Sequence, residues 1–170
     1  MAASKYDFRV QKFVYISGAL TDMSEDERAR LRSFYESLAD VCLEAGFNAY
    51  LPHVYSDPAT ALALQPDQVD LLDRTAVTLS YLVIAYVGVP SFGVGIEVEM
   101  AHHAHKPVIL LCEKEKLETR RVSRLVRGNP RVIQTIAFSD FADAAVQIRT
   151  ALAMFKEAVA GSVFTPPLLP

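Results

Sequence analysis

This chain of 170 residues has few cysteines, a small net charge and no long apolar run, and each of these features argues against a class of protein. Cys42 and Cys112 are the two cysteines, and both lie among apolar neighbours outside any metal-ligand spacing, so we predict buried free thiols. A net charge of −3 supplies no positive field that would collect the backbone of a nucleic acid. The most apolar run, Tyr81 to Pro90, is about half as long as a membrane span.

Apolar residues make up 51% of the chain and charged residues 22%, which is typical of a globular protein with one hydrophobic core. Charged residues interrupt the beginning of the chain, where a signal peptide would have its apolar core, and we therefore expect a cytoplasmic protein. We expect residues 1–160 to form one domain. Residues 161–170 contain three prolines and are expected to form an irregular tail.

Short apolar runs alternate with segments of helical periodicity along the chain. The runs typical of buried strands are at 13–18, 47–51, 81–87, 107–111 and 132–138. The segments typical of helices are at 24–46, 66–80, 115–127 and 141–159. A further helix is expected after the glycine-containing loop 88–95 and ends at about residue 105. This alternation predicts an α/β fold in which helices flank a doubly wound, Rossmann-like or flavodoxin-like, five-stranded parallel sheet.

Ligands of such sheets bind beyond the carboxyl ends of the strands, and the richest segment there is the loop from Pro90 to Glu97. Gly93 and Gly95 allow a ligand to approach the backbone, and the following helix N-terminus favours an anion. The pattern lacks the third glycine of a dinucleotide-binding loop, which leaves only a weak case for such a site. Glu97, expected in the first helical turn, is either functional or present for its favourable interaction with the helix dipole.

Asp73 is a second candidate carboxylate, on the helix that precedes the central strand. Helical arithmetic predicts a buried stripe made of Val69, Leu72, Ala76 and Leu79. Asp73 lies at the edge of this stripe, where it could border a cleft. Asp70 points away from the stripe and is expected to pair with Arg74 on a solvated face.

These residues together resemble a known family. Tyr15 to Gly18, Asp73 and the segment Pro90-Ser-Phe-Gly-Val-Gly-Ile-Glu97 are similar to motifs of the nucleoside 2-deoxyribosyltransferase superfamily, and the closest likeness is to its 2′-deoxynucleoside 5′-phosphate N-hydrolases. Asp73 and Glu97 are 24 residues apart, as are the paired carboxylates of the family. The resemblance spans about residues 13–128.

The resemblance implies a role for each matching residue. Glu97 would be the nucleophile on the anomeric carbon, Asp73 would position the substrate and move protons, and Tyr15 would line the sugar site. The implied substrate-binding residues are Ser17, Gly18, His53, Ser91, Gly93, Gly95, Ser123 and Arg127. Ser17 and Ser91 resemble phosphate contacts, and Ser123 matches a serine that these hydrolases lend to the neighbouring subunit. No cofactor is implied.

Three positions depart from the hydrolase pattern. The segment Ala19-Leu20-Thr21-Asp22 stands where the hydrolases have an Arg-Gly turn, Tyr81 replaces an aspartate, and Leu51-Pro52 replaces Thr-Glu before His53. The phosphate-binding arginine of the turn is therefore missing. On a continuous helix Arg120, Arg124 and Arg127 would share one side, and we expect at least one of them to compensate from the partner subunit.

The residues and the resemblance together predict a hydrolase that cleaves the N-glycosidic bond of a (deoxy)nucleoside 5′-monophosphate and releases base and sugar phosphate. The expected assembly is a homodimer or larger homo-oligomer with a shared active site. A transferase that exchanges bases and a non-catalytic nucleotide-binding module are the two alternatives. His102, His103 and His105 lack further ligands of suitable type, so we predict a polar helix end there and no metal site.

Overall fold

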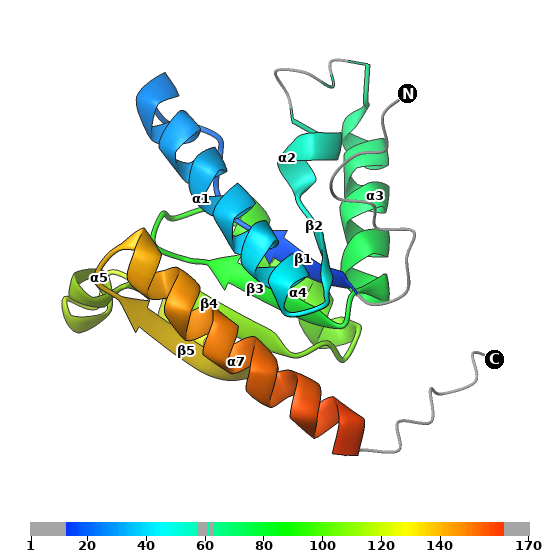
Figure 1. The fold of residues 1–170 in the computed structure, drawn as a ribbon. Helices are drawn as coiled ribbons and strands as arrows, with labels where there is room; N and C mark the ends of the chain where they lie inside the picture. The colour runs from blue at the N-terminus through cyan, green and yellow to red at the C-terminus, as the bar shows by residue number, and fades with distance from the viewer. Residues whose placement is uncertain (1–12, 58–60, 62, 162–170) are drawn as a thin grey trace.

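Five β-strands form the centre of the structure, which is a computed structural model that describes residues 13–57, 61 and 63–161 (Figure 1). The strands are β1 (Phe13–Ser17), β2 (Asn48–Tyr50), β3 (Leu82–Tyr86), β4 (Val108–Glu113) and β5 (Val132–Phe138). All neighbouring pairs are parallel, and the order across the sheet is β2-β1-β3-β4-β5. This is the flavodoxin-like order, so the predicted fold is confirmed, and the chain reverses its direction of winding between β1 and β3.

Helices cover both faces of this sheet (Figure 1). They are α1 (Glu25–Glu44), α2 (Pro52–Tyr55), α3 (Pro66–Leu79), α4 (Phe92–His103), α5 (Lys114–Glu118), α6 (Arg124–Arg127) and α7 (Phe141–Gly161). Helices α1 and α7 pack on one face, and α3 and α4 pack on the other. The tail predicted for residues 161–170 lies outside the described residues apart from Gly161, the last residue of α7.

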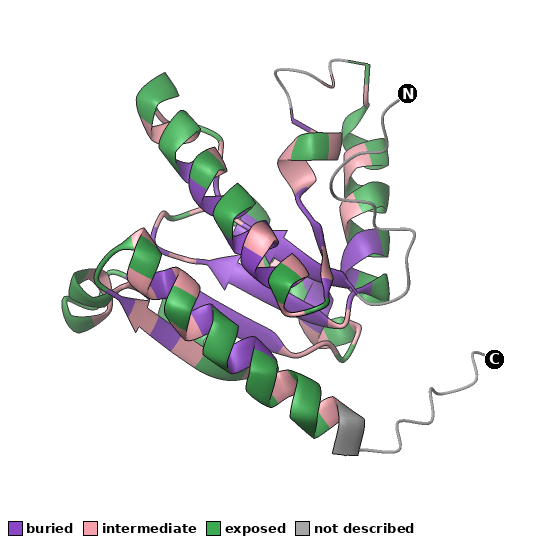
Figure 2. Ribbon diagram, in the orientation of Figure 1, coloured by how far each residue is buried: buried purple, intermediate pink, exposed green. Residues whose placement is uncertain are grey.

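Each face of the sheet has its own hydrophobic core, because side chains of a strand alternate between the two faces. In β1, Val14 and Ile16 belong to the core beneath α1 and α7, whereas Phe13 and Tyr15 belong to the core beneath α3 and α4. The central strands are buried along their whole length (Figure 2). This explains why their sequences are continuously apolar rather than alternating.

Cys42 and Cys112 are buried and free, as predicted. In the part of the chain that the structure describes, no helix is both long enough and apolar enough to cross a lipid bilayer.

The predicted helix over 115–127 is wrong in one respect, because the segment forms two short helices instead of one. Helix α5 ends at Glu118, and Arg120 then has a positive φ of 59°. Val122 is buried at 3% exposure and fixes the segment between the helices, after which Ser123 caps α6. Arg120 therefore does not share a helical face with Arg124 and Arg127. Helix α2 is a further difference: it begins with Pro52, a residue favoured in the first turn of a helix.

Candidate active site

Helix α4 begins earlier than the sequence indicated and changes the position of Glu97. The side chain of Ser91 caps the helix by accepting a hydrogen bond from the backbone N–H of Val94 (3.4 Å), so α4 starts at Phe92 and contains both glycines of the loop. Glu97 consequently lies in the second turn, not in the first, and the helix dipole does not account for it. Its side chain instead faces the end of β1.

Two hydroxyl groups of β1 hold the Glu97 carboxylate. Tyr15 donates a hydrogen bond to Oε1 (2.6 Å), and Ser17 donates one to Oε2. The two residues are separated by one position, so both side chains leave the same face of the sheet. Both oxygens of Glu97 are therefore fixed in orientation, which is what a nucleophile aimed at one carbon atom needs.

Burial determines the protonation of this carboxyl group. It raises the pKa of Glu97 to about 7, because desolvation disfavours the ionised form more strongly than the hydroxyl groups of Ser17 and Tyr15 favour it, and the nearby negative charge of Asp73 adds to the increase. A carboxyl group with a pKa near neutrality, in a cleft, is typical of catalytic sites.

Asp73 lies on the inward face of α3, beside the sheet. The predicted stripe was wrong at Leu72 and Leu79, which are 37% and 60% exposed, while Ala76 and Val77 are buried. Burial raises the pKa of Asp73 to about 6, even though the hydrogen bond from Tyr50 lowers it. The predicted ion pair between Asp70 and Arg74 is present on the opposite, exposed side of the helix (2.8 Å).

A stack of tyrosines connects the two carboxylates. Tyr15 and Tyr50 are paired in register on neighbouring strands, and their ring centroids are 5.2 Å apart. Tyr55 stacks on the other side of Tyr50 at 4.8 Å. The hydroxyl of Tyr15 donates to Glu97, and that of Tyr50 donates to Asp73 (3.4 Å). Tyr50 was not among the residues predicted from the sequence.

Glu97 opens onto a cleft of about 160 Å³ between the loop after β1, helix α2 and the beginning of α4. Its lining includes four more of the predicted residues, which are Gly18, His53, Ser91 and Gly93. Gly18 has a structural reason to be glycine, because a Cβ atom there would lie 2.2 Å from the ring of Tyr35. The cleft also contains Asp57, which the sequence analysis did not single out.

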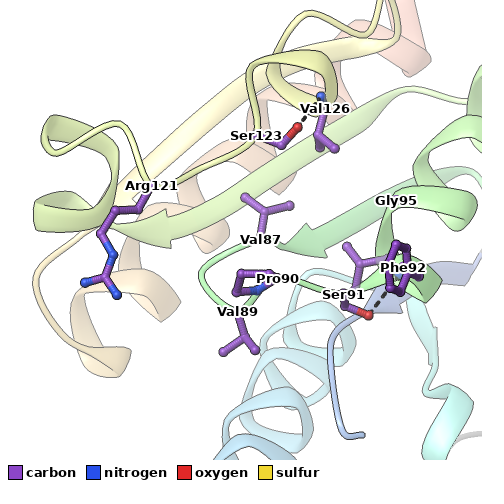
Figure 3. Close-up of a pocket in the computed structure, with 10 residues that line it drawn as sticks. Val87, Val89, Pro90, Ser91, Phe92, Gly95, Arg121, Ser123 and Val126 are labelled. Carbon is purple, nitrogen blue, oxygen red and sulfur yellow. Dashed lines mark hydrogen bonds between the residues drawn. The ribbon is translucent and has the colours of Figure 1, made fainter. Parts of the chain in front are cut away.

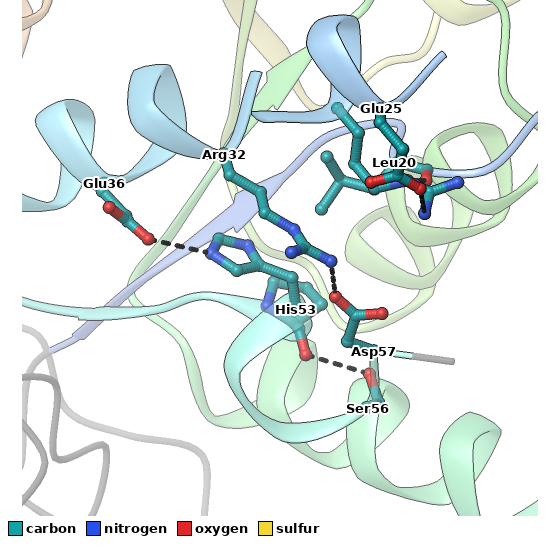
Figure 4. Close-up of polar contacts among 9 residues, drawn as sticks. Leu20, Glu25, Arg32, Glu36, His53, Ser56 and Asp57 are labelled. Atoms are coloured by element: carbon teal, nitrogen blue, oxygen red, sulfur yellow. Dashed lines mark hydrogen bonds and ion pairs between the residues drawn. The ribbon is translucent and has the colours of Figure 1, made fainter. Parts of the chain in front are cut away.

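His53 lines this cleft, but the Nε2 atom of its ring faces Glu36 on α1. Its Nε2 atom lies 3.7 Å from the Glu36 carboxylate on α1 (Figure 4). Burial lowers the pKa of His53, although the charge of Glu36 acts in the opposite direction.

Two of the three remaining predicted substrate-binding residues lie at a second cavity of about 390 Å³, which shares Ser91 with the first (Figure 3). Gly95 and Ser123 line it, together with Arg121. A Cβ atom on Gly95 would meet no atom within 4 Å, so packing inside the chain does not require glycine there. Arg127 is exposed and lines neither cavity. Within one chain, Ser123 and Arg127 therefore lie outside the cleft of Glu97.

Among the described residues, no group of three or more histidine, cysteine, aspartate or glutamate side chains could hold a metal ion. His103 instead lies 3.3 Å from Glu99 on its own helix.

Comparison with solved structures finds the same fold in proteins of low sequence identity. Clostridium botulinum CMP N-glycosidase, BcmB, is 24% identical, with 82% of this chain and 99% of that chain covered and a TM-score of 0.57. BlsM is 23% identical, with 91% and 98% covered and a TM-score of 0.69. A 2-deoxyribosyltransferase from Leishmania mexicana is 13% identical, with 82% and 97% covered and a TM-score of 0.52. No protein-family model matches the chain, and a search of curated proteins gave no match. The chain thus shares its fold with a CMP N-glycosidase and a 2-deoxyribosyltransferase, in line with the resemblance of its motifs.

Proposed function

We propose that this chain is an enzyme that hydrolyses the N-glycosidic bond of a (deoxy)nucleoside 5′-monophosphate. The observation that carries the proposal is the carboxylate of Glu97, held by Tyr15 and Ser17 at the floor of a cleft with a second perturbed carboxylate, Asp73, beside it. The shared fold with an N-glycosidase and a 2-deoxyribosyltransferase supports this chemistry.

The two carboxylates suffice for a balanced two-step reaction. Ionised Glu97 attacks the anomeric carbon, the C–N bond breaks, and its electron pair stays on the base nitrogen, which takes a proton from Asp73. Water then attacks the anomeric carbon and gives a proton to Asp73, and the bond to Glu97 breaks. The products are the free base and a sugar 5-phosphate, and one water molecule is consumed. The hydroxyl groups of Tyr15 and Ser17 stabilise Glu97 in its ionised forms before and after the covalent step.

The phosphate of the substrate fits the beginning of α4. Backbone N–H groups in the first turn of a helix have no partner inside the helix, and together with the helix dipole they favour an anion. Ser91 and Gly93 lie at this point and both line the cleft of Glu97. The loop that lacks the hydrolase arginine is instead held from α1, where Arg28 donates to the carbonyl oxygen of Leu20 (3.1 Å).

The exposed apolar side chains around α4 support a homo-oligomer. Phe92 is 94% exposed, Leu125 is 87% exposed and Ile96 is 53% exposed, and all three line a third cavity of about 660 Å³. An apolar patch of this kind is typical of a surface that another protein covers. We propose that a second copy of the chain covers it and completes the site with Ser123.

Glu97→Ala tests the function, with Glu44→Ala at the end of α1 as the control, because Glu44 lines none of the three cavities. Each protein is incubated with a panel of nucleoside 5′-monophosphates and nucleosides, and released base and sugar phosphate are measured by chromatography. We expect Glu97→Ala to abolish turnover but to keep nucleotide binding by calorimetry, whereas the exposed Glu44 can be replaced without large loss. Near-normal turnover in Glu97→Ala would falsify the mechanism.

Two further outcomes decide between the alternatives. Incorporation of an added labelled base into nucleoside would identify a transferase. Binding without turnover by the wild-type protein across the whole panel would identify a nucleotide-binding module.

A further inference from the structure

The cleft of Glu97 has a second polar end, formed by α2 and the residue that follows Ser56. Pro52, His53, Ser56 and Asp57 line this end. Ser91 and Gly93, where α4 begins, line the same cleft. The proposed function, on which this inference rests, places the anomeric carbon at Glu97 and the phosphate at α4. Because the base and the phosphate are the two ends of a nucleotide, this places the base at the part of the cleft that α2 lines.

Asp57 is the polar group that stands out at the α2 end. It is a carboxylate with only 7% exposure, and the guanidinium group of Arg32 on α1 forms an ion pair with it (Figure 4). The pair offsets the cost of burying the negative charge and fixes the carboxylate at the wall of the cleft. A carboxylate has about four lone-pair positions, so it can accept from Arg32 and from a ligand together.

The neighbouring side chains contribute less to this end of the cleft. The hydroxyl of Ser56 donates to the carbonyl oxygen of Pro52 (3.1 Å), and Nε2 of His53 faces Glu36 (Figure 4). The charged group that lines this end is therefore an acceptor of hydrogen bonds and not a donor. An acceptor at this position is complementary to a nucleobase edge that donates hydrogen bonds.

We propose that Asp57, positioned by Arg32, selects a nucleobase that carries an exocyclic amino group over the corresponding keto base. An amino group of cytosine or adenine donates a hydrogen bond to a carboxylate. The keto oxygen of uracil or hypoxanthine in the same place is also an acceptor, so it forms no hydrogen bond with the carboxylate and is repelled by it. A good pairing of this kind discriminates between bases by roughly 10- to 100-fold.

The test compares kcat/KM within matched substrate pairs, CMP with UMP and AMP with IMP, each as ribonucleotide and deoxyribonucleotide. The amino member of at least one pair should be favoured by about 10-fold or more in the wild-type protein. In Asp57→Asn the amide keeps one oxygen for Arg32 and presents donors to the cleft, so the preference should disappear or reverse. Asp57→Ala should remove the preference without reversing it. Glu36→Gln, which changes the carboxylate on the far side of His53, should keep the wild-type ratio.

The outcomes separate this inference from the proposed function. If the wild-type protein cleaves nucleotides but favours neither member of either pair, or if a folded Asp57 variant keeps the full preference, Asp57 does not select the base. If the wild-type protein cleaves no nucleotide and Glu97→Ala binds none by calorimetry, the proposed function itself is wrong and the inference fails with it. The wild-type ratios keep the inference testable even if both Asp57 variants fail to fold, because the absence of any preference is enough to overturn it.

Discussion

At the scale of single residues, Tyr50 links the sheet to Asp73, the proposed acid–base group of the site. It is 1% exposed, it stacks between Tyr15 and Tyr55, and its hydroxyl donates to Asp73 (3.4 Å). A hydroxyl that donates to a carboxylate stabilises the ionised form. Tyr50 is thus a positioning residue that restrains the increase in the pKa of Asp73 caused by burial.

Tyr50→Phe should shift the pH dependence of activity to higher pH. The productive state needs Glu97 ionised and Asp73 protonated, so kcat/KM should fall below the lower and above the higher pKa of the coupled pair, near 6 and 7. Loss of the Tyr50 hydroxyl raises the pKa of Asp73 further, which moves the acidic limb upward by at most about one pH unit, the value of one hydrogen bond.

The control for this prediction is Tyr55→Phe, which keeps the stack and leaves the hydrogen bond from Tyr50 to Asp73 in place. The measurement is the pH profile of kcat/KM for both variants. An unchanged profile in Tyr50→Phe, or the same displacement in Tyr55→Phe, would mean that the stack serves only packing.

The sequence could identify some site residues but not others for a physical reason. Glu97 and Asp73 were found because their spacing and the surrounding glycines resemble a family motif. Tyr50, Asp57 and Arg32 were missed because their importance comes from the pairing of β2 with β1 and from contacts between α1 and the residue after α2. Such contacts between distant segments leave no local pattern in the chain.

At the scale of elements, the beginning of α4 combines a structural and a proposed binding role in Ser91. Its side chain caps the helix, and its position lines the cleft. Ser24 has the first role without the second, because it caps α1 by accepting from the N–H of Glu27 (3.3 Å) and does not line the cleft.

Ser91→Ala and Ser24→Ala therefore form a matched pair. Loss of either cap should lower the free energy of unfolding by about 1 kcal/mol. Only Ser91→Ala should also reduce kcat/KM for a nucleoside 5′-monophosphate more than for the nucleoside, by about 10-fold, the value of one hydrogen bond to a charged group. Chemical unfolding and steady-state kinetics measure the two effects. An equal loss on both substrates in Ser91→Ala would argue against a phosphate contact.

Element boundaries show where local sequence signals were insufficient. The two glycines before Glu97 favoured a loop because glycine is unfavourable in a helix, yet the Ser91 cap starts α4 ahead of them. The interruption between α5 and α6 depends on the burial of Val122, which no periodicity within the segment reveals. The five strands, by contrast, were predictable because burial on both faces of the sheet makes them continuously apolar.

At the scale of the whole molecule, the strand order explains where the site lies. The chain reverses its winding between β1 and β3, and a crevice opens where the loops that leave these strands diverge. Tyr15 and Ser17 come from the first of these strands, and Glu97 comes from the helix that follows the second. The alternation of elements predicted a parallel sheet, but the order of its strands depends on packing between distant segments.

The last prediction concerns two copies of this molecule. Ser123 lies across the second cavity from Ser91, but it does not line the cleft of Glu97 in its own chain, so it can reach substrate only in a partner's cleft. A symmetric dimer through Phe92, Ile96 and Leu125 would bury the exposed apolar patch twice. Leu125→Glu should therefore give a monomer by light scattering and greatly reduce activity.

Mixing Glu97→Ala with the double variant Ser123→Ala, Arg127→Ala should restore one complete site in each heterodimer, because the double variant supplies Glu97 and its partner supplies Ser123. If heterodimers form from two impaired parents and activity does not recover, each chain works with its own residues alone.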